Sequence, residues 1–470
     1  MKDLLLSYYG DDFTGSTDAL EALSRAGVKS VLFLRPPSGA ARAHFADVEA
    51  VGLAGNARSL TPAEMDEVLP PLFAELASLG APVTHYKTCS TFDSSPEVGS
   101  IGRALEIGQE VFGAPFVPLL VGVPSLGRYC VFGNLFARAG AGSDGQPYRL
   151  DRHPTMSRHP VTPMNESDLL LHLGLQTAKH SALFDVLQYG LDERERAARL
   201  DALLADGPEV VLFDLLEVEQ LEKAGRLIWE GASREQPLFA VGSSGVQYAL
   251  AAHWRQAGLI GPARSYAALE AAPQVLAVSG SCSPVTEGQL REAAAHGYAV
   301  VAFDAAGLVD PERSDDARGE AIAEARRHLA LGSSVVLHSC LGPQDERIPA
   351  TASALEARGF SPQEARLQRG KLLGTAIGQT LRALLEEGDV RRVIVAGGDT
   401  SGNVAAALGI EALQMIAPLA PGGPLCRAYA PQSPFHDLEI AFKGGQVGKR
   451  DFFATALNGE RQSVPERGPT

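Results

Sequence analysis

Two adjacent carboxylates, Asp11 and Asp12, follow a short apolar run, Leu4–Tyr9, near the start of the chain. The pattern after them predicts a helix with Ser16 or Thr17 as its cap residue. Open parallel sheets bind ligands at the carboxyl ends of their strands, and neighbouring carboxylates repel each other, so we interpret the pair as functional. Asp12 is the better placed base for a substrate hydroxyl, whereas Asp11 orients it, binds a cation or caps the helix.

Two cationic side chains, Arg58 and Lys87, each lie just past another predicted strand. Together with Asn56, Ser90 and Thr91 they have the chemistry to hold an anionic ligand that is rich in hydroxyl groups, because arginine binds carboxylates through paired hydrogen bonds. The alternative is a pair of solvated surface charges. Two cations and two carboxylates at equivalent strand ends favour a binding site.

The C-terminal half contains three turns of small residues, at 279–284, 397–402 and 443–449, and each directly follows a predicted strand. Glycine lets backbone N–H groups approach phosphate oxygens closely, and a helix that begins there favours negative charge. One such turn alone is more simply a tight strand-to-helix connection, but three at one sheet edge indicate a phosphate site. Asp399 either reaches a phosphate-bound Mg²⁺ or caps the next helix. The sequence contains neither a GxxxxGK(S/T) motif nor a GxGxxG motif after a strand.

The composition is that of a globular protein. The chain has 470 residues, 45% hydrophobic and 21% charged, and this length predicts two domains. A net charge of −15 argues against nucleic acid and anionic membranes as partners. The five cysteines are scattered without a CxxC pair, so neither a disulfide framework nor a zinc site is expected. No signal-peptide pattern or transmembrane-length segment is found, and we expect a soluble cytoplasmic protein.

Strands alternate with helices along the chain, and the pattern restarts at residue 274 after a weakly patterned stretch at 258–273. We therefore predict the α/β class, with two α/β domains that each contain a mainly parallel sheet flanked by helices. The expected boundaries are 1–265 for the N-terminal domain, 272–456 for the C-terminal domain and 457–470 for a polar tail.

A long loop interrupts the first domain between residues 140 and 159. Two His-Pro pairs, at His153 and His159, lie in or next to it. They are ligand contacts, parts of a shaped lid, or rigid loop residues. A metal site is less favoured, because the sequence does not identify the remaining ligands.

The order and spacing of these motifs resemble the four-carbon acid sugar kinase family, whose members phosphorylate small sugar acids with ATP. The resemblance covers roughly residues 4–453. The matching segments are 11–15, 58–59, Lys87 with Ser90 and Thr91, 159–164, 242–245, 280–283, 397–402, 443–448 and 451–453.

The resemblance implies that the N-terminal domain binds the sugar acid, that the C-terminal domain binds ATP, and that the active site lies in the cleft between them. It implies Asp12 as catalytic base, and it implies substrate-binding roles for Asp11, Arg58, Lys87, Ser90 and Thr91. The residues implied to bind ATP are Ser281, Ser283, Gly397, Gly398, Asp399, Thr400, Gly445 and Gly448. ATP, Mg²⁺ and a small sugar acid are the expected cofactors and ligands, a homodimer is the expected assembly, and the Mg²⁺ ligands are not identified.

Two departures from the family pattern bear on the substrate. Members typically read Lys-x-Asp-Ser-Thr-Leu-Arg-Gly, whereas here Cys89 replaces the acid and Phe92-Asp93-Ser94 replaces Leu-Arg-Gly. The final turn reads Lys-Gly-Gly-Gln-Val-Gly in place of Lys-Ser-Gly-Asn-Phe-Gly, which is a milder change. Loss of an arginine from a substrate loop should change which acid fits. The first departure resembles that of a divergent subgroup, and such subgroups act on oxidised or branched acids. The resemblance therefore implies 3-oxo-isoapionate, with 3-oxo-tetronate, threonate and erythronate as alternatives.

Three other classes of protein stay open from the sequence. A non-catalytic sugar-acid sensor would need Arg58 and Lys87 but not the three turns, so ATP binding distinguishes it. A phosphatase would use the paired acids, although haloacid-dehalogenase-type enzymes separate theirs by one residue, and phosphate release would support it. An NAD-dependent oxidoreductase lacks its glycine fingerprint here, and a nicotinamide absorbance change would support it.

Overall fold

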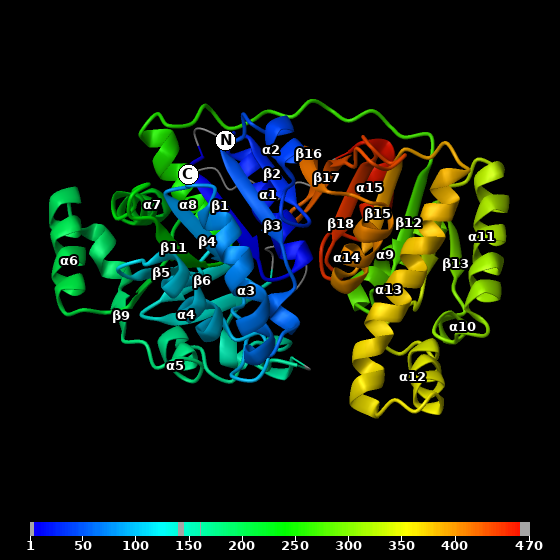
Figure 1. Ribbon diagram of the computed structural model, residues 1–470, viewed down its shortest axis with the longest axis horizontal. Coiled ribbons are helices and arrows are strands. Elements are labelled where there is room, and N and C mark those ends of the chain that lie inside the picture. Colours follow the sequence, from blue (N-terminus) through cyan, green and yellow to red (C-terminus); the bar gives the residue numbers. More distant parts are fainter. Residues whose placement is uncertain (1–3, 140–144, 160, 461–470) are drawn as a thin grey trace. The chain divides into compact units, whose positions relative to one another are not determined.

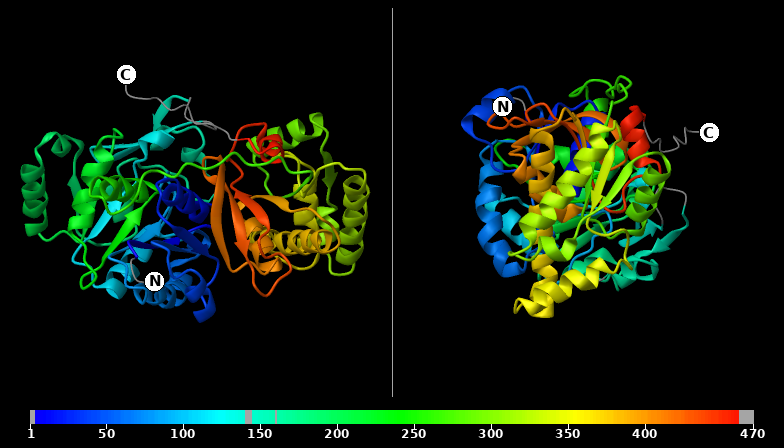
Figure 2. Two further views of the ribbon diagram at one scale, coloured as in Figure 1. Left: turned by 90° about the horizontal axis from the view of Figure 1, so that it is seen from above. Right: turned by 90° about the vertical axis from the view of Figure 1, so that its right-hand side faces the viewer.

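The computed structural model describes residues 4–139, 145–159 and 161–460. The chain divides into two compact units, Met1–Ser265 and Tyr266–Thr470. In each unit, helices cover both faces of a mainly parallel sheet, which confirms the predicted α/β class (Figures 1 and 2). Among the described residues, no helix combines the length and the apolar character needed to cross a bilayer.

The main sheet of the first unit is parallel and has the order β2-β3-β1-β4-β11-β5-β10-β9. Its strands are β1 (Leu6–Gly10), β2 (Ser30–Phe33), β3 (Ala50–Ala54), β4 (Val83–Lys87), β5 (Val117–Leu120), β9 (Ser181–Phe184), β10 (Val210–Phe213) and β11 (Leu238–Gly242). A small antiparallel sheet consists of β6 (Arg128–Val131), β7 (Asn134–Arg138) and β8 (Pro147–Arg149).

The helices of the first unit follow the strands in the alternation that the sequence predicted. They are α1 (Phe13–Arg25), α2 (Gly39–His44), α3 (Pro62–Ala77), α4 (Ile101–Phe112), α5 (Leu169–Gly174), α6 (Glu193–Ala205), α7 (Gln220–Glu230) and α8 (Gly245–Gln256). Helix α3 packs beside α4, and α8 packs with α1 and α7. Between α3 and the sheet, the rings of Tyr9 and Tyr86 stack with their centres 5.9 Å apart, and the Phe73 ring of α3 packs edge-on against both. This aromatic core holds β1 and β4 together beneath the loops that follow them.

The main sheet of the second unit has the order β13-β14-β12-β15-β18-β17-β16. Its strands β12 (Val275–Ser279), β13 (Ala299–Ala302), β14 (Val335–His338), β15 (Arg392–Ala396) and β18 (Glu439–Lys443) are parallel, whereas β16 (Ala412–Ala420) and β17 (Gly423–Tyr429) are antiparallel additions. Its helices are α9 (Pro284–Ala295), α10 (Ala305–Leu308), α11 (Ser314–Ala330), α12 (Arg347–Ala357), α13 (Pro362–Glu386), α14 (Gly398–Ala407) and α15 (Phe452–Asn458). Helix α15 runs into the segment predicted as a polar tail, and residues 461–470 of that segment lie outside the described residues.

The two main sheets share the order of their first four strands. In chain order the neighbours are the second, third, first and fourth strands, as β2-β3-β1-β4 in one unit and β13-β14-β12-β15 in the other. The chain leaves the first strand toward one edge of the sheet and leaves the fourth toward the other. The loops after these two adjacent strands therefore diverge, which is the switch point at which open α/β sheets bind ligands.

Candidate functional site

Four strands of the first unit end at the same level of the sheet. Gly10 at the end of β1 is in register with Ala54 of β3 and Lys87 of β4, and Lys87 is in register with Gly242 of β11. The loops that follow these strands therefore emerge side by side. They carry the acids and cations that the sequence singled out.

Arg58, in the short 3₁₀ helix η1 (Ala57–Ser59), joins the two acids. Its Nε and Nη2 donate to the two carboxylate oxygens of Asp11 at 3.1 and 2.8 Å, and Nη2 also donates to Asp12 Oδ1 at 3.1 Å. Burial raises the pKa of Asp11 to about 6, although the charge of Arg58 opposes this. Burial alone would lower the pKa of Arg58, but Asp11 and Asp12 outweigh it and raise that pKa. The Arg58 guanidinium thus reduces the repulsion between the two acids by binding both, and its bidentate hydrogen bond is made to Asp11.

Asp12 is the N-cap of α1, and its Oδ1 accepts a hydrogen bond from the Gly15 N–H at 2.8 Å. The predicted caps, Ser16 and Thr17, are instead buried in the first turns of the helix. The prediction was wrong because the Asp12 carboxylate, directly after the strand, already accepts from a free N–H group at the start of the helix. Ser16 and Thr17 lie farther along the chain, inside the helix.

The two acids differ in their access to solvent. The side chain of Asp12 is 22% exposed, whereas that of Asp11 is 5% exposed. Gly15 keeps the space between Asp12 and the cation of β4 open, because a Cβ there would lie 2.3 Å from Asp12 Oδ1 and 3.1 Å from Lys87 Nζ. Asp12 is therefore the acid that a substrate hydroxyl can reach, and it lies beside a lysine.

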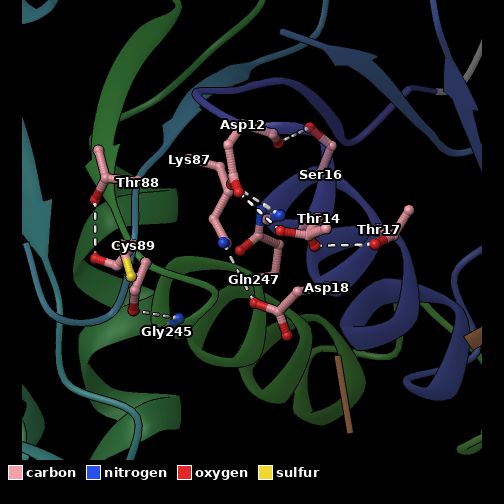
Figure 3. A network of polar contacts seen from close by, with 12 residues as sticks. Asp12, Thr14, Ser16, Thr17, Asp18, Lys87, Thr88, Cys89, Gly245 and Gln247 are labelled. Carbon is pink, nitrogen blue, oxygen red and sulfur yellow. Dashed lines mark hydrogen bonds and ion pairs between the residues drawn. The ribbon is translucent and has the colours of Figure 1, made fainter. Parts of the chain in front are cut away.

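Lys87 is buried at the end of β4, with its Nζ 3.3 Å from Asp18 Oδ2, and Figure 3 shows it between Asp12 and Asp18. Burial alone would lower the pKa of Lys87, but Asp18, Asp12 and Asp11 outweigh it and raise that pKa. The lysine is therefore charged at neutral pH. Asp18 was not predicted from the sequence. The signal available for it is an acid in the first two turns of the helix that follows the paired acids.

The loop after β4 forms a polar cluster near Arg58. Cys89 Sγ lies 2.9 Å from Thr91 Oγ1, and this hydroxyl donates to Asp93 Oδ1 at 2.6 Å. Burial alone would raise the pKa of Asp93, but Arg58 and the Thr91 hydroxyl lower it overall. Burial raises the pKa of Cys89 to about 11, which keeps it a neutral thiol. Ser90 lies half-buried in the same turn.

The two histidines of the His-Pro pairs hold their own loop. His153 Nδ1 accepts from the backbone N–H groups of Thr155 and Met156 at 3.3 and 3.2 Å. His159 Nδ1 accepts from the Thr162 N–H at 3.1 Å. These bonds favour the rigid-loop interpretation of both residues. Residue 160, which completes the second pair, lies outside the described residues.

The strands of the second unit also end in register. Ser279 of β12 pairs with Ala396 of β15, which in turn pairs with Lys443 of β18. The three turns of small residues follow these three positions, and β12 and β15 are the adjacent strands at the switch point. The turns that the sequence singled out therefore begin at one edge of one sheet.

Close contacts pack the three turns together. A Cβ on Gly280 would lie 2.1 Å from Thr400 Oγ1, and a Cβ on Gly445 would lie 2.5 Å from Ser281 Oγ. Gly397 has a φ of 122°, which favours glycine, and a Cβ there would lie 3.4 Å from the Ser281 nitrogen. The glycines are thus needed for the close approach of the turns as well as for their conformation.

The first turn leads directly into α9. Ser283 is the N-cap of this helix and accepts from the Val285 N–H at 3.2 Å. Ser281 Oγ accepts from the Ser283 N–H at 3.2 Å and from the Thr286 hydroxyl at 3.1 Å. In the third turn, Gly448 has a φ of 87°, so its position also favours glycine.

The second turn leads into α14, whose N-cap is Gly397 and makes no side-chain cap bond. Asp399 lies exposed in the first helical turn. Of its two predicted roles, capping of the helix is therefore not supported by the geometry. The first N–H groups of α14 are open to an anion.

Two buried polar residues of α9, which the sequence analysis missed, tie the first turn to the third. Thr286 Oγ1 donates to the Gly445 carbonyl at 2.9 Å. Gln289 Nε2 donates to the carbonyls of Val447, Gly448 and Lys449 at 2.9, 3.1 and 2.9 Å. Both side chains are fully buried. The sequence signal for this link was that Thr286 and Gln289, three positions apart, are polar residues on the helix face that otherwise packs on the sheet.

Two family models match the chain. A "Sugar-binding N-terminal domain" matches residues 6–250, and a "Nucleotide-binding C-terminal domain" matches residues 276–453. Among curated proteins, a 3-oxo-isoapionate kinase of Paraburkholderia graminis is 48% identical over 97% of this chain and 94% of its own. A 3-oxo-tetronate kinase of Cupriavidus necator is 30% identical over 96% of each chain.

Two crystal structures share the fold along almost the whole chain. A protein from Salmonella typhimurium LT2 matches with a TM-score of 0.74 at 24% identity, over 97% of this chain and 99% of that one. A Haemophilus influenzae protein matches with a TM-score of 0.68 at 23% identity, over 96% and 98%. At these identities the likeness shows the fold alone. The family models and the full-length kinase relatives confirm what the motifs predicted, and the chain belongs to the four-carbon acid sugar kinase family.

Proposed function

We propose that this protein is an ATP-dependent kinase that phosphorylates a hydroxyl group of 3-oxo-isoapionate. The observation that carries the proposal is the 48% identity, over 97% of the chain, to the Paraburkholderia graminis protein named 3-oxo-isoapionate kinase. Two 3-oxo-tetronate kinases are 30% and 31% identical over a similar span. The charged cluster of the first unit and the three turns of the second have the chemistry that such a reaction needs.

The sugar acid would bind to the cluster in the first unit. The carboxylate would be attracted to Arg58 and Lys87, whose charges are fixed by the surrounding acids. Asp12 would accept the proton of the substrate hydroxyl as the hydroxyl oxygen bonds to the γ-phosphorus of ATP. The bond between that phosphorus and the bridging oxygen breaks, and ADP leaves. Asp12 fits this role because it is the more exposed acid and lies beside a cation.

The phosphates of ATP would bind to the three turns of the second unit, through the N–H groups that begin α9 and α14. Mg²⁺ bound to ATP commonly needs only one or two protein carboxylates. Asp399 is an exposed carboxylate at these turns and fits that requirement. When bound, the ion would neutralise charge on the phosphates. The interdomain position of the active site and the homodimer stay predictions.

A kinase for 3-oxo-tetronate is the second candidate, because several such kinases match the full chain at about 30% identity. The loop after β4 bears on the choice. Cys89 is a neutral thiol there, and Asp93 is a buried acid near Arg58. This loop changes both the charge and the shape of the region around the guanidinium, so it favours a substrate that differs from those of the typical members.

The test is ADP release, coupled to NADH loss, with ATP-Mg²⁺ and a panel of sugar acids. The panel contains 3-oxo-isoapionate, 3-oxo-tetronate, threonate and erythronate, and a reaction without acid measures hydrolysis of ATP by water. We expect the highest kcat/KM with 3-oxo-isoapionate, and mass spectrometry should find one added phosphoryl group on it. A higher kcat/KM with 3-oxo-tetronate than with 3-oxo-isoapionate would identify 3-oxo-tetronate as the substrate instead. ATP binding without turnover on any acid would contradict the proposal and support a non-catalytic binding protein.

A further inference from the structure

Lys443 is a buried lysine directly beneath the three turns. It ends β18, and none of its surface is exposed. Its Nζ donates a long hydrogen bond to Thr286 Oγ1 at 3.4 Å and lies 5.7 Å from the centre of the Phe452 ring. Within the described part of the chain, no carboxylate forms an ion pair with it. Fully buried lysines are rare unless an anion pairs with them, so this one needs an explanation.

The Thr286 hydroxyl links the amine of this lysine, which begins the third turn, to Ser281 of the first turn and to Gly445 of the third. Thr286 Oγ1 donates to the Gly445 carbonyl at 2.9 Å and to Ser281 Oγ at 3.1 Å. Its proton is therefore directed at the turns, and its lone pairs face the Lys443 amine. A charge on Lys443 would polarise this hydroxyl and act on the segment that the phosphates are proposed to contact.

The chain contains a direct comparison for this group. Lys87 is also buried, but three acids raise its pKa. For Lys443 burial is the only cause of a shift, and it lowers the pKa to about 7. The ionisable side chains on the neighbouring segments are Cys282 and Asp399 of the first two turns, Glu287, Arg291 and Glu292 of α9, Lys449 at the end of the third turn, and Arg450 and Asp451 after it. None of them is a cause of the shift.

We propose that the phosphates of bound ATP supply the missing anion, so that Lys443 takes up a proton when the nucleotide binds. This deepens the proposed function and rests on it. Lys443 is then a positioning residue, because it acts on the phosphates through Thr286 and the turns. In the free protein Lys443 is uncharged, so the turns hold no buried charge without a partner. When phosphate is bound, the charged Lys443 stabilises the complex between the turns and the phosphate.

The direction of the pH effect follows from the charges. Above pH 7 the amine of the free protein is mostly neutral, and an adjacent anion raises its pKa. Binding must then recruit a proton from solution, so ATP affinity falls as pH rises. The limit is about tenfold in Kd for each pH unit above the pKa of the free protein.

Calorimetric titration of the full-length protein with ATP-Mg²⁺ at pH 8, in two buffers of different ionisation enthalpy, measures this proton uptake directly. We expect uptake of about half a proton or more per ATP bound, and a Kd that weakens several-fold from pH 7.5 to 8.5. In Lys443→Met the uptake and this pH dependence should both disappear. Lys443→Arg should bind ATP without uptake, because a guanidinium stays protonated.

A matched variant separates this lysine from other lysines of the protein. Lys29→Met makes the same change at an exposed lysine of the first unit. It should keep the uptake of the parent protein. ATP binding by the parent without proton uptake, or uptake that persists in Lys443→Met, overturns this inference alone. Absence of ATP binding by the parent protein overturns the proposed function and this inference together.

Discussion

Replacement of Asp12 by asparagine should remove the catalytic base and leave the rest of the site in place. Asparagine is as good an N-cap as aspartate, and its amide oxygen can still accept from the Gly15 N–H and from Arg58. The Thr14 hydroxyl, which donates to Asp12 Oδ2 at 2.8 Å, can rotate and accept from the new amide group. The change therefore removes one negative charge and one proton acceptor.

General base catalysis typically contributes about 10²- to 10⁴-fold, so kcat should fall by that factor, or about 3–5 kcal/mol in barrier height. The KM for ATP should stay within about twofold, because the three turns belong to the other unit. The assay is coupled ADP release with 3-oxo-isoapionate, and thermal unfolding checks that the variant is folded.

Asp192→Asn is the matched control for this variant. Asp192 caps α6 through a bond from the Glu195 N–H at 2.8 Å, so the same change is made at a helix N-cap away from the charged cluster. Its kcat should equal that of the parent protein. If the folded Asp12→Asn variant kept its kcat within about threefold of the parent protein, Asp12 would not be the base. The greater solvent exposure of Asp12 than of Asp11 would then not identify the catalytic acid.

Three further outcomes test other parts of the structure. Gly445→Ala places a Cβ 2.5 Å from Ser281 Oγ, so ATP should bind about tenfold more weakly by calorimetry, and an unchanged Kd would show that the turns do not hold the phosphates. The Cys340 thiol donates to Cys282 Sγ at 3.1 Å and lowers the pKa of Cys282. Iodoacetamide should therefore label Cys282 before the other cysteines at pH 7.5, and ATP should protect it. Uniform labelling of the cysteines in peptide mass spectra would contradict this. Burial lowers the pKa of His85 from 6.5 to about 3, so below pH 6.5 the unfolded chain binds a proton at this residue that the folded chain does not. The free energy of unfolding measured in urea should therefore fall by about 2 kcal/mol from pH 6.5 to 5. His85→Asn should flatten that part of the profile, whereas an unchanged slope would assign it to other groups.

The alternation of strands and helices was sufficient to predict the fold class, and it also placed the chemistry at strand ends. The paired acids, Arg58 and Lys87 lie together because β1, β3 and β4 end in register. A sequence pattern gives the end of each strand but not the register between strands. For this reason the bidentate bond from Arg58 to Asp11 could not be foreseen, and Arg58 was expected, with Lys87, to contact the substrate.

The residues that sequence analysis missed are those that act through another residue. Asp18 raises the pKa of Lys87, and Thr286 and Gln289 tie two turns together from a buried helix face. Each lies within a regular helix, where a polar residue is ordinarily read as solvated. Only the three-dimensional packing shows that these side chains point toward loops far away in the sequence.

The two units share a strand order, but their buried cations differ in whether carboxylates of the protein pair with them. In the first unit, Arg58 and Lys87 are each paired with carboxylates of the protein, so both are charged without a bound ligand. In the second unit, no carboxylate of the described residues forms an ion pair with Lys443, and burial is the only cause of its pKa shift. A small acid carries one charge and needs a site that is already polarised, whereas a nucleotide carries several and can supply the counter-charge itself. Arg58 and Lys87 should therefore keep their charges across neutral pH, while Lys443 should change its charge state when its ligand binds.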